Sequence, residues 1–378
     1  MNREEIIHDF IELAKIDSPS FGERKMADAV KAKLSQLGIE VSEDDAGSHY
    51  QLTDQDGNSR QGSAGNLFAK VPGTLPGGPI LLCSHLDTVD PALEKKPILH
   101  EDGRITSDGT TVLGSDDLAG VTEILSALRI AKEKGLPHRD LELIFPIGEE
   151  LYDKGTKVFD FSKITSKQAY ILDMSGPVGA AALQAPSIIS YQITVEGKAS
   201  HAGFNPEDGV HAIAIASQAI SKVRQGHLDS ETTLNIGTIT GGVGTNIVPE
   251  ICTITGEIRS YVHEKAMKAL ENLAEIFREC AKEAGASIKE DHEIHIYAYK
   301  TGEEENVVKE FKASCQRLGL PGTLTSTFGG SDNNNFALHQ IPGLVLSCGM
   351  SAVHSVHEYV ESEDLIRGTQ LVLDLITH

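Results

Sequence analysis

The sequence lacks long apolar runs, an excess of positive charge and closely paired cysteines. No apolar run approaches membrane-spanning length, and Met1–Glu5 opens into an amphipathic pattern, so we expect neither a membrane span nor a signal peptide. The net charge of −22 argues against partners such as nucleic acid or an anionic membrane. The five cysteines are scattered without a Cys-x-x-Cys motif, which is typical of free thiols in a reducing cytoplasm.

What the chain does contain is an alternation of short apolar strands and amphipathic helices. Ile80–Cys83 is apolar throughout, the mark of a strand buried on both faces. Further strands are predicted at 141–147 and 169–172, with a helix over 117–134. This order predicts the α/β class, with a mostly parallel sheet and helices on both faces. Active sites of such sheets gather beyond the carboxyl ends of the strands.

The middle of the chain has a different order of elements. From about residue 190 to 298 the pattern reads strand, helix, strand, strand, helix, strand, which is the βαββαβ order of ferredoxin-like domains. We therefore predict a catalytic domain whose first part is 1–185 and whose second part is 297–378. Residues 186–296 would form an inserted ferredoxin-like domain.

Acidic residues and one histidine stand where predicted strands give way to loops. They are His85, Asp87, Asp116, Asp117, Glu149, Glu150 and Asp173. Imidazole nitrogen and carboxylate oxygen suit zinc, manganese or cobalt. A glutamate beside a metal-ligand glutamate can act as a general base toward water. These residues predict a metal-dependent hydrolase with two metal ions.

Six short motifs, in order along nearly the whole chain, resemble a known family of co-catalytic metallopeptidases and deacylases. That family includes peptidase T, carboxypeptidase G, acetylornithine deacetylase and succinyl-diaminopimelate desuccinylase. The motifs are Ser84–Val89, Leu113–Gly120, Gly148–Glu150, Asp173, Ala199–Gly203 and His354–Val360. Within the family, the chain looks most like peptidase T-like proteins.

The resemblance implies a centre of two divalent metal ions, with zinc expected and manganese or cobalt as alternatives. His85 and Asp173 would bind one ion, and Glu150 and His354 would bind the other. Asp116 would bridge the two.

The resemblance also implies roles around the metals. Glu149 would be the general base, and Asp87 would orient His85 by accepting its second ring N–H. In the inserted domain, His201 would polarise the scissile carbonyl or stabilise the oxyanion. Asn246 and Arg259 would hold substrate oxygens, although a surface salt bridge is an alternative for Arg259.

Two assignments stay ambiguous at this point. Asp116 and Asp117 are neighbours, and Asp117 also stands where a helix N-cap is expected. His354 and His357 lie in one predicted loop, and spacing alone does not choose between them. The family motif selects Asp116 and His354.

The chain departs from the family pattern in two places. Leu118 stands where many relatives carry lysine, and Phe328 stands where peptidase T has an arginine before Gly-Gly-Thr-Asp. The missing arginine removes one anchor for a peptide carboxylate. Strict specificity for tripeptides is therefore not expected.

The predicted function is hydrolysis of the N-terminal bond of short peptides by a cytoplasmic enzyme that forms a homodimer through its inserted domain. One alternative is an N-acyl amino acid deacylase or carboxypeptidase of the same family. Another is a non-catalytic metal- or peptide-binding protein. The intact Glu149 argues against this last alternative, because a binding protein needs no base beside its ligand.

Overall fold

The computed structural model describes residues 2–53, 57 and 59–378, and the chain divides into two compact units. Unit 1 comprises Met1–Leu183, Lys300–Ser326 and Ser331–His378. Unit 2 comprises Gln184–Tyr299 together with Thr327–Gly330. The sequence predicted divisions at 186 and 297, but it did not predict that a short segment near residue 328 would group with the inserted domain.

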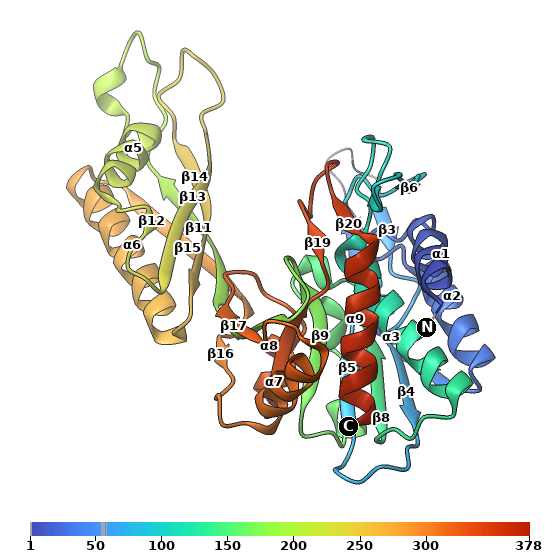
Figure 1. The fold of residues 1–378 in the computed structure, drawn as a ribbon. Coiled ribbons are helices and arrows are strands. Elements are labelled where there is room, and N and C mark those ends of the chain that lie inside the picture. Colours follow the sequence, from blue (N-terminus) through green and yellow to red (C-terminus); the bar gives the residue numbers. More distant parts are fainter. Residues whose placement is uncertain (1, 54–56, 58) are drawn as a thin grey trace. The chain divides into compact units, whose positions relative to one another are not determined.

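A nine-stranded mixed sheet forms the centre of unit 1 (Figure 1). Its strands run in the order β1 (Val41–Glu43), β4 (Leu67–Val71), β8 (Leu141–Phe145), β5 (Ile80–Cys83), β9 (Ala169–Met174), β18 (Gly343–Ser347), β10 (Ala180–Ala185) and β16 (Tyr299–Lys300), with β17 (Thr323–Ser326) paired to β10. The neighbours β8, β5, β9 and β18 are parallel. The pairs β1–β4, β4–β8 and β10–β18 are antiparallel. The predicted α/β class is confirmed, with the parallel strands at the centre.

Helices cover both faces of this sheet. They are α1 (Arg3–Ala14), α2 (Arg24–Gln36), α3 (Ser115–Lys134), α4 (Lys154–Lys157), α7 (Asn306–Leu318), α8 (Asn333–Leu338) and α9 (Ser362–Thr377). The residues of strand β5 show why both faces of the sheet must be buried. Ile80 and Leu82 join the core formed with α1, α3 and α9, whereas Leu81 and Cys83 pack toward Phe336 of α8. Alternate side chains of a strand point to opposite faces, so an all-apolar strand requires two cores.

A smaller sheet positions the loop that carries His354. Its order is β19 (Met350–Ser351), β20 (Tyr359–Glu361), β7 (Arg104–Thr106) and β6 (Ile98–Leu99). Strand β20 pairs antiparallel with both β19 and β7. The loop between β19 and β20 is therefore held to the segment that leads from β7 to Asp116. A separate hairpin joins β2 (Gln51–Thr53) to β3 (Ser59–Gln61).

Unit 2 has the predicted ferredoxin-like fold. Its elements are β11 (Ser187–Glu196), α5 (Ala212–Lys222), β12 (Gly226–His227), β13 (Thr232–Gly241), β14 (Ile251–Ser260), α6 (His263–Glu283) and β15 (Ser287–Ile296). The sheet order is β12-β13-β14-β11-β15, and its pairs are antiparallel. Both helices bury their apolar side chains in one core with the sheet, as Ile215 and Phe277 illustrate. The β13-β14-β11-β15 order is that of a split βαβ fold.

The helices of the described residues include none that is both long and apolar enough to cross a membrane. All five cysteines are buried free thiols. Cys83 lies in the core on the α8 face of the large sheet, and Cys280 lies in the core of unit 2. They act there as small apolar side chains.

Glu123 is a fully buried acid between α3 and α9. Its Oε1 has no hydrogen-bond partner among the described residues, and a Cβ on Gly368 would clash with its carboxylate. Burial raises the pKa of Glu123 well above its usual value, and the charge of Asp364 adds to the shift. The folded state therefore holds this proton more tightly than the unfolded state does, so stability is lost as the pH rises.

We expect Glu123→Gln to remove this loss of stability. The variant should be close to wild type at about pH 4, where the unfolded glutamate is protonated as well, and more stable than wild type at about pH 8. Urea unfolding at both pH values would measure the difference. A variant that is equally destabilised at both values would contradict the prediction.

Candidate active site

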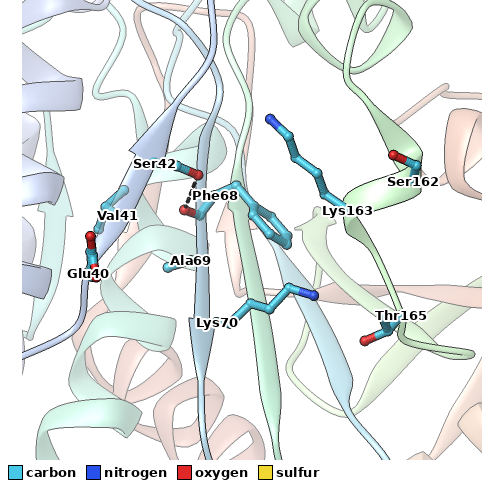
Figure 2. Close-up of a pocket in the computed structure, with 9 residues that line it drawn as sticks. All are labelled: Glu40, Val41, Ser42, Phe68, Ala69, Lys70, Ser162, Lys163 and Thr165. Atoms are coloured by element: carbon cyan, nitrogen blue, oxygen red, sulfur yellow. Dashed lines mark hydrogen bonds between the residues drawn. The ribbon is translucent and has the colours of Figure 1, made fainter.

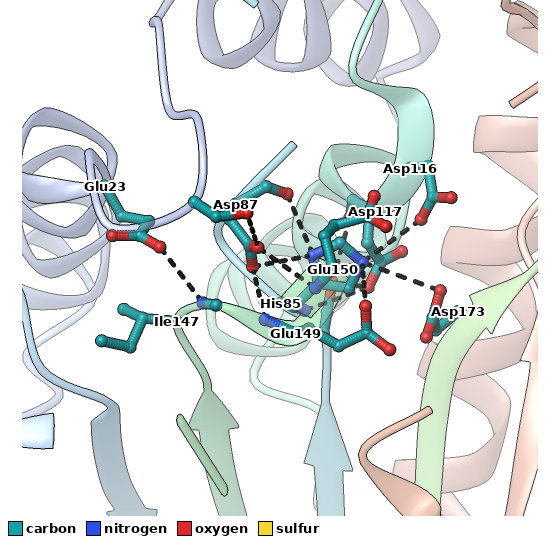
Figure 3. Close-up of polar contacts among 12 residues, drawn as sticks. Glu23, His85, Asp87, Asp116, Asp117, Ile147, Glu149, Glu150 and Asp173 are labelled. Atoms are coloured by element: carbon teal, nitrogen blue, oxygen red, sulfur yellow. Dashed lines mark hydrogen bonds and ion pairs between the residues drawn. The ribbon is translucent and has the colours of Figure 1, made fainter. Parts of the chain in front are cut away.

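The buried ring of His85 lies at the centre of an acidic cluster (Figure 3). Its Nε2 is 3.2 Å from Oδ1 of Asp116, 3.7 Å from Oδ1 of Asp173 and 3.8 Å from Oε2 of Glu149. His85 follows β5, Glu149 follows β8 and Asp173 lies near the end of β9. Because β8 and β9 are the parallel neighbours of β5, all three side chains arrive at the same edge of the sheet.

The other ring nitrogen of His85 faces Asp87. Nδ1 lies 3.0 Å from the backbone oxygen of Asp87 and 3.4 Å from its Oδ1. The Asp87 carboxylate also accepts the backbone N–H groups of Glu149, at 3.0 Å, and Glu150, at 3.2 Å. A proton on Nδ1 leaves the Nε2 lone pair free to bind a metal ion. Asp87 thus contacts both the histidine and the loop of the two glutamates.

Asp116 lies between two imidazoles. Its Oδ1 faces His85, and its Oδ2 is 3.3 Å from Nε2 of His354. Asp117 has different contacts, because its Oδ2 accepts the hydroxyl of Ser84 at 2.5 Å and the backbone N–H of His85 at 3.1 Å. Its Oδ1 has no hydrogen-bond partner among the described residues and lies against Gly120. Asp117 therefore fastens the end of β5 instead of capping α3, and the two carboxylate oxygens of Asp116 face the rings of His85 and His354.

Glu150 approaches the second histidine. Its Oε2 is 2.9 Å from Nε2 of His354, whose backbone is left-handed with φ 59°. His357 points elsewhere, into a hollow that it shares with His100, Arg104 and Tyr359. Of the two histidines in this loop, the ring of His354 is the one that contacts the acidic cluster.

Burial and mutual repulsion raise the pKa values of three carboxyl groups, whereas hydrogen bonds with His354 and His85 outweigh burial and lower the pKa of Asp116. Burial, with the charge of Asp173, raises the pKa of Glu149 well above its usual value. Burial and the charge of Asp116 raise the pKa of Glu150 and that of Asp173 to about 7. Hydrogen bonds to Asp116 and Glu150 raise the pKa of His354 to about 10. The two imidazoles of the cluster therefore do not offset the negative charge of its carboxylates.

These residues fit a divalent metal centre. Ligand atoms of His85, Asp116 and Glu150 lie within 4.8 Å of one another, and so do those of His85, Asp117 and Asp173. The buried Oε1 of Glu150 has no hydrogen-bond partner in the described part of the chain. A cation would supply that partner and offset the repulsion, and the donor set of imidazole and carboxylate suits zinc, manganese or cobalt.

His201 and Asn246 belong to unit 2. Nδ1 of His201 accepts the backbone N–H of Gly203 at 3.1 Å, so a neutral ring carries its proton on Nε2. The ring stacks on Phe204 with centroids 4.3 Å apart and is exposed. The backbone oxygen of Asn246 accepts the N–H of Ala202 at 3.0 Å. The segments that carry the two predicted residues are therefore neighbours.

Arg259 is engaged within unit 2. Its Nε donates to Oε1 of Glu257 at 2.5 Å, and one terminal nitrogen donates to the backbone oxygen of Phe328 at 2.6 Å. The ring of Phe328 also lies 4.5 Å from that of Tyr261. The salt bridge that the sequence left open is thus present. These contacts explain why Thr327–Gly330 groups with unit 2.

Comparison with known proteins identifies the family. Residues 184–285 match the family model described as the peptidase dimerisation domain of M20. The aminopeptidase PepT of Bacillus cereus is 37% identical, covers 100% of this chain and 98% of its own, and has a TM-score of 0.91. This chain belongs to the M20 peptidase family. It is therefore a hydrolase of the peptidase T-like type, as the six motifs predicted.

Three further proteins are similar to this M20 peptidase along nearly its whole length. A tripeptidase of Staphylococcus aureus is 33% identical, with coverage of 100% of this chain and 98% of that one and a TM-score of 0.94. The uncharacterized protein YqjE of Bacillus subtilis is 36% identical over 376 residues, with coverage of 100% and 98%. A dinuclear metal-binding M20 peptidase of Bacillus subtilis shares the fold, at 16% identity, coverage of 99% and 97%, and a TM-score of 0.73.

No role was predicted for Glu358, which holds the loop that carries Asp116. Its carboxylate is buried and accepts the hydroxyl of Ser115 at 2.7 Å and the backbone N–H groups of Gly114, at 2.8 Å, and Asp116, at 2.9 Å. Glu358 lies in the last of the six motifs. That position was the available signal, but only the fold shows which loop the carboxylate holds.

A separate hollow of about 580 Å³ lies beside β1 and β4 (Figure 2). Its lining includes Phe68, Lys70 and Lys163. Lys70 is already paired with the buried Glu142 at 3.0 Å. None of the predicted site residues lines this hollow, so it is distinct from the acidic cluster.

Proposed function

We propose that this M20 peptidase uses two divalent metal ions to cleave the N-terminal peptide bond of short peptides. Zinc is the metal that we expect. His85 and Asp173 would hold one ion, Glu150 and His354 the other, and Asp116 both. When bound, the ions would polarise the scissile carbonyl and lower the pKa of a water molecule. The single observation that carries the proposal is the position of Asp116 between the rings of His85 and His354.

Glu149 would serve as the general base. It is buried, and its Oε2 lies 3.8 Å from Nε2 of His85, so it borders the ligand cluster. Its carboxylate would accept a proton from the attacking water and return it to the departing amine. The backbone contact with Asp87 holds the residue in place.

The acidic surroundings favour a substrate with a free amino group. The carboxylates of the cluster form their ion pairs with the rings of His85 and His354. A positively charged peptide amine is attracted to such a surplus of carboxylate, and an acyl chain is not. The similarity to an aminopeptidase over the whole chain supports the same reading. His201, Asn246 and Arg259 remain proposed substrate contacts, with the Nε2 proton of His201 as an oxyanion donor.

We expect trialanine to be hydrolysed with a kcat/KM at least about tenfold above that of N-acetyl-trialanine, since a charge-assisted contact is lost on acetylation. Dialanine and trialanine should differ by less than about tenfold, because Phe328 cannot bind a C-terminal carboxylate as arginine does. Assays at matched concentrations with added zinc, manganese or cobalt would measure these ratios. An equal or faster rate for the acetylated peptide would favour a deacylase instead.

We further propose that unit 2 mediates a homodimer. The matched family model is a dimerisation domain. Unit 2 also exposes large apolar side chains, among them Val243 at 91% and Phe204 at 81%. Burial of these side chains against a second chain would stabilise a dimer.

A further inference from the structure

The segment 18–23, between α1 and α2, contacts both loops of the candidate active site. The backbone N–H of Thr88 donates to the oxygen of Ser18 at 2.9 Å, and Pro19 forms a β-bridge with Thr88. The hydroxyl of Ser20 donates to Oδ2 of Asp87 at 2.7 Å. The segment is thus fastened to the loop that carries His85 and Asp87.

Glu23 fastens the same segment to the loop of the two glutamates (Figure 3). Its side chain is fully buried, and its Oε1 accepts the backbone N–H of Phe21 at 2.7 Å and that of Gly148 at 3.1 Å. Gly148 has φ 59°, and a Cβ there would meet the ring of Phe21 at 2.8 Å. The loop therefore packs closely against the segment and has no room to shift toward it.

Three successive N–H groups are consequently held by two carboxylates. Glu23 accepts from Gly148, and Asp87 accepts from Glu149 and Glu150. A buried N–H that loses its acceptor is costly, so this arrangement fixes the backbone of the loop. The side chains of Glu149 and Glu150 project from that backbone.

We propose that Glu23 is a positioning residue for Glu149, and that Ser20 supports it through Asp87. Glu23 contacts no atom expected to react. It sets the distance between the base and His85 through the backbone of Gly148. Misplacement of a catalytic group by about 1 Å can cost about a hundredfold in rate. The proposal rests on the proposed role of Glu149 as general base.

The test compares two substitutions at Glu23 with one at another buried glutamate. Glu23→Met keeps an unbranched chain but removes the acceptor, and we expect kcat for trialanine to fall about 10- to 100-fold with KM changed less than about threefold. Glu23→Gln keeps an acceptor oxygen at the position of Oε1, because its amide nitrogen can occupy the position of Oε2, which has no hydrogen-bond partner among the described residues. Its kcat should stay within about fivefold of wild type. Glu123→Met makes the same change in the α3–α9 core and should leave kcat within about twofold.

A double variant separates positioning from general destabilisation. If Glu23 acts through Glu149, Glu23→Met should cost less than about threefold in the Glu149→Gln background, because there is no base left to misplace. A full 10- to 100-fold loss in that background, or an unchanged kcat in the single variant, would overturn the proposal. If Glu23→Met does not fold, Ser20→Ala takes its place in the test. We expect Ser20→Ala to lower kcat about three- to tenfold in the wild-type background and to have no such effect in the Glu149→Gln background.

If the proposed function itself were wrong, the kinetics would differ from both of these outcomes. In that case Glu149→Gln itself would retain near-normal kcat, whatever the effect of Glu23→Met. Metal content by mass spectrometry should stay close to the wild-type level in the Glu23 variants, because Glu23 is not a proposed ligand and Asp87 still holds the backbone N–H of Glu150.

Discussion

Glu149→Gln is expected to lower kcat for trialanine by about two to four decades, the usual worth of a general base. The substitution keeps the size of the side chain and one acceptor oxygen but removes the group that takes the proton. Its backbone N–H, which donates to Asp87, is untouched, so the loop should keep its conformation. Steady-state kinetics and metal analysis of the same preparation would measure both effects.

Glu150→Gln is the matched comparison for this variant, since it alters the adjacent residue of the same turn. Oε2 of Glu150 contacts His354 and is a proposed metal ligand, so this second variant should lose activity together with metal. Glu149→Gln should lose activity and keep its metal. Near-normal turnover of Glu149→Gln would remove the residue from its proposed role.

His354→Ala is expected to lose about half of the bound metal and to lower kcat by about a hundredfold or more, because one ion would keep too few protein ligands. His357→Ala should keep both ions and most of the activity. The two histidines share one loop, so the pair controls for disturbance of its fold. The contrast follows from geometry, since His354 contacts Asp116 and Glu150 whereas His357 lines a separate hollow.

Metal analysis after dialysis, combined with trialanine assays, would measure the contrast. A loss of metal from His357→Ala with retention by His354→Ala would reverse the assignment. If neither variant lost metal, the second ion would need other ligands than those proposed.

Several features of this protein could be read from the sequence because they depend on local pattern. The apolar run Ile80–Cys83 required a strand covered on both faces, and the structure has a core on each side of it. The βαββαβ order of the middle segment required one antiparallel sheet with two helices, which unit 2 contains. Strand ends also predicted that His85, Glu149 and Asp173 would meet, because neighbouring parallel strands end at one edge.

Other features depend on contacts between segments that are far apart in the chain, and only the tertiary structure decided them. Spacing could not show that Ser84 and the backbone of His85 donate to Asp117, whereas Asp116 faces the rings of His85 and His354. Glu23 reads as one acid among many at the start of a helix, yet it is buried against Gly148. Glu358 likewise holds a loop more than two hundred residues away. A buried carboxylate takes its role from the N–H groups that folding brings to it, and no local pattern encodes those partners.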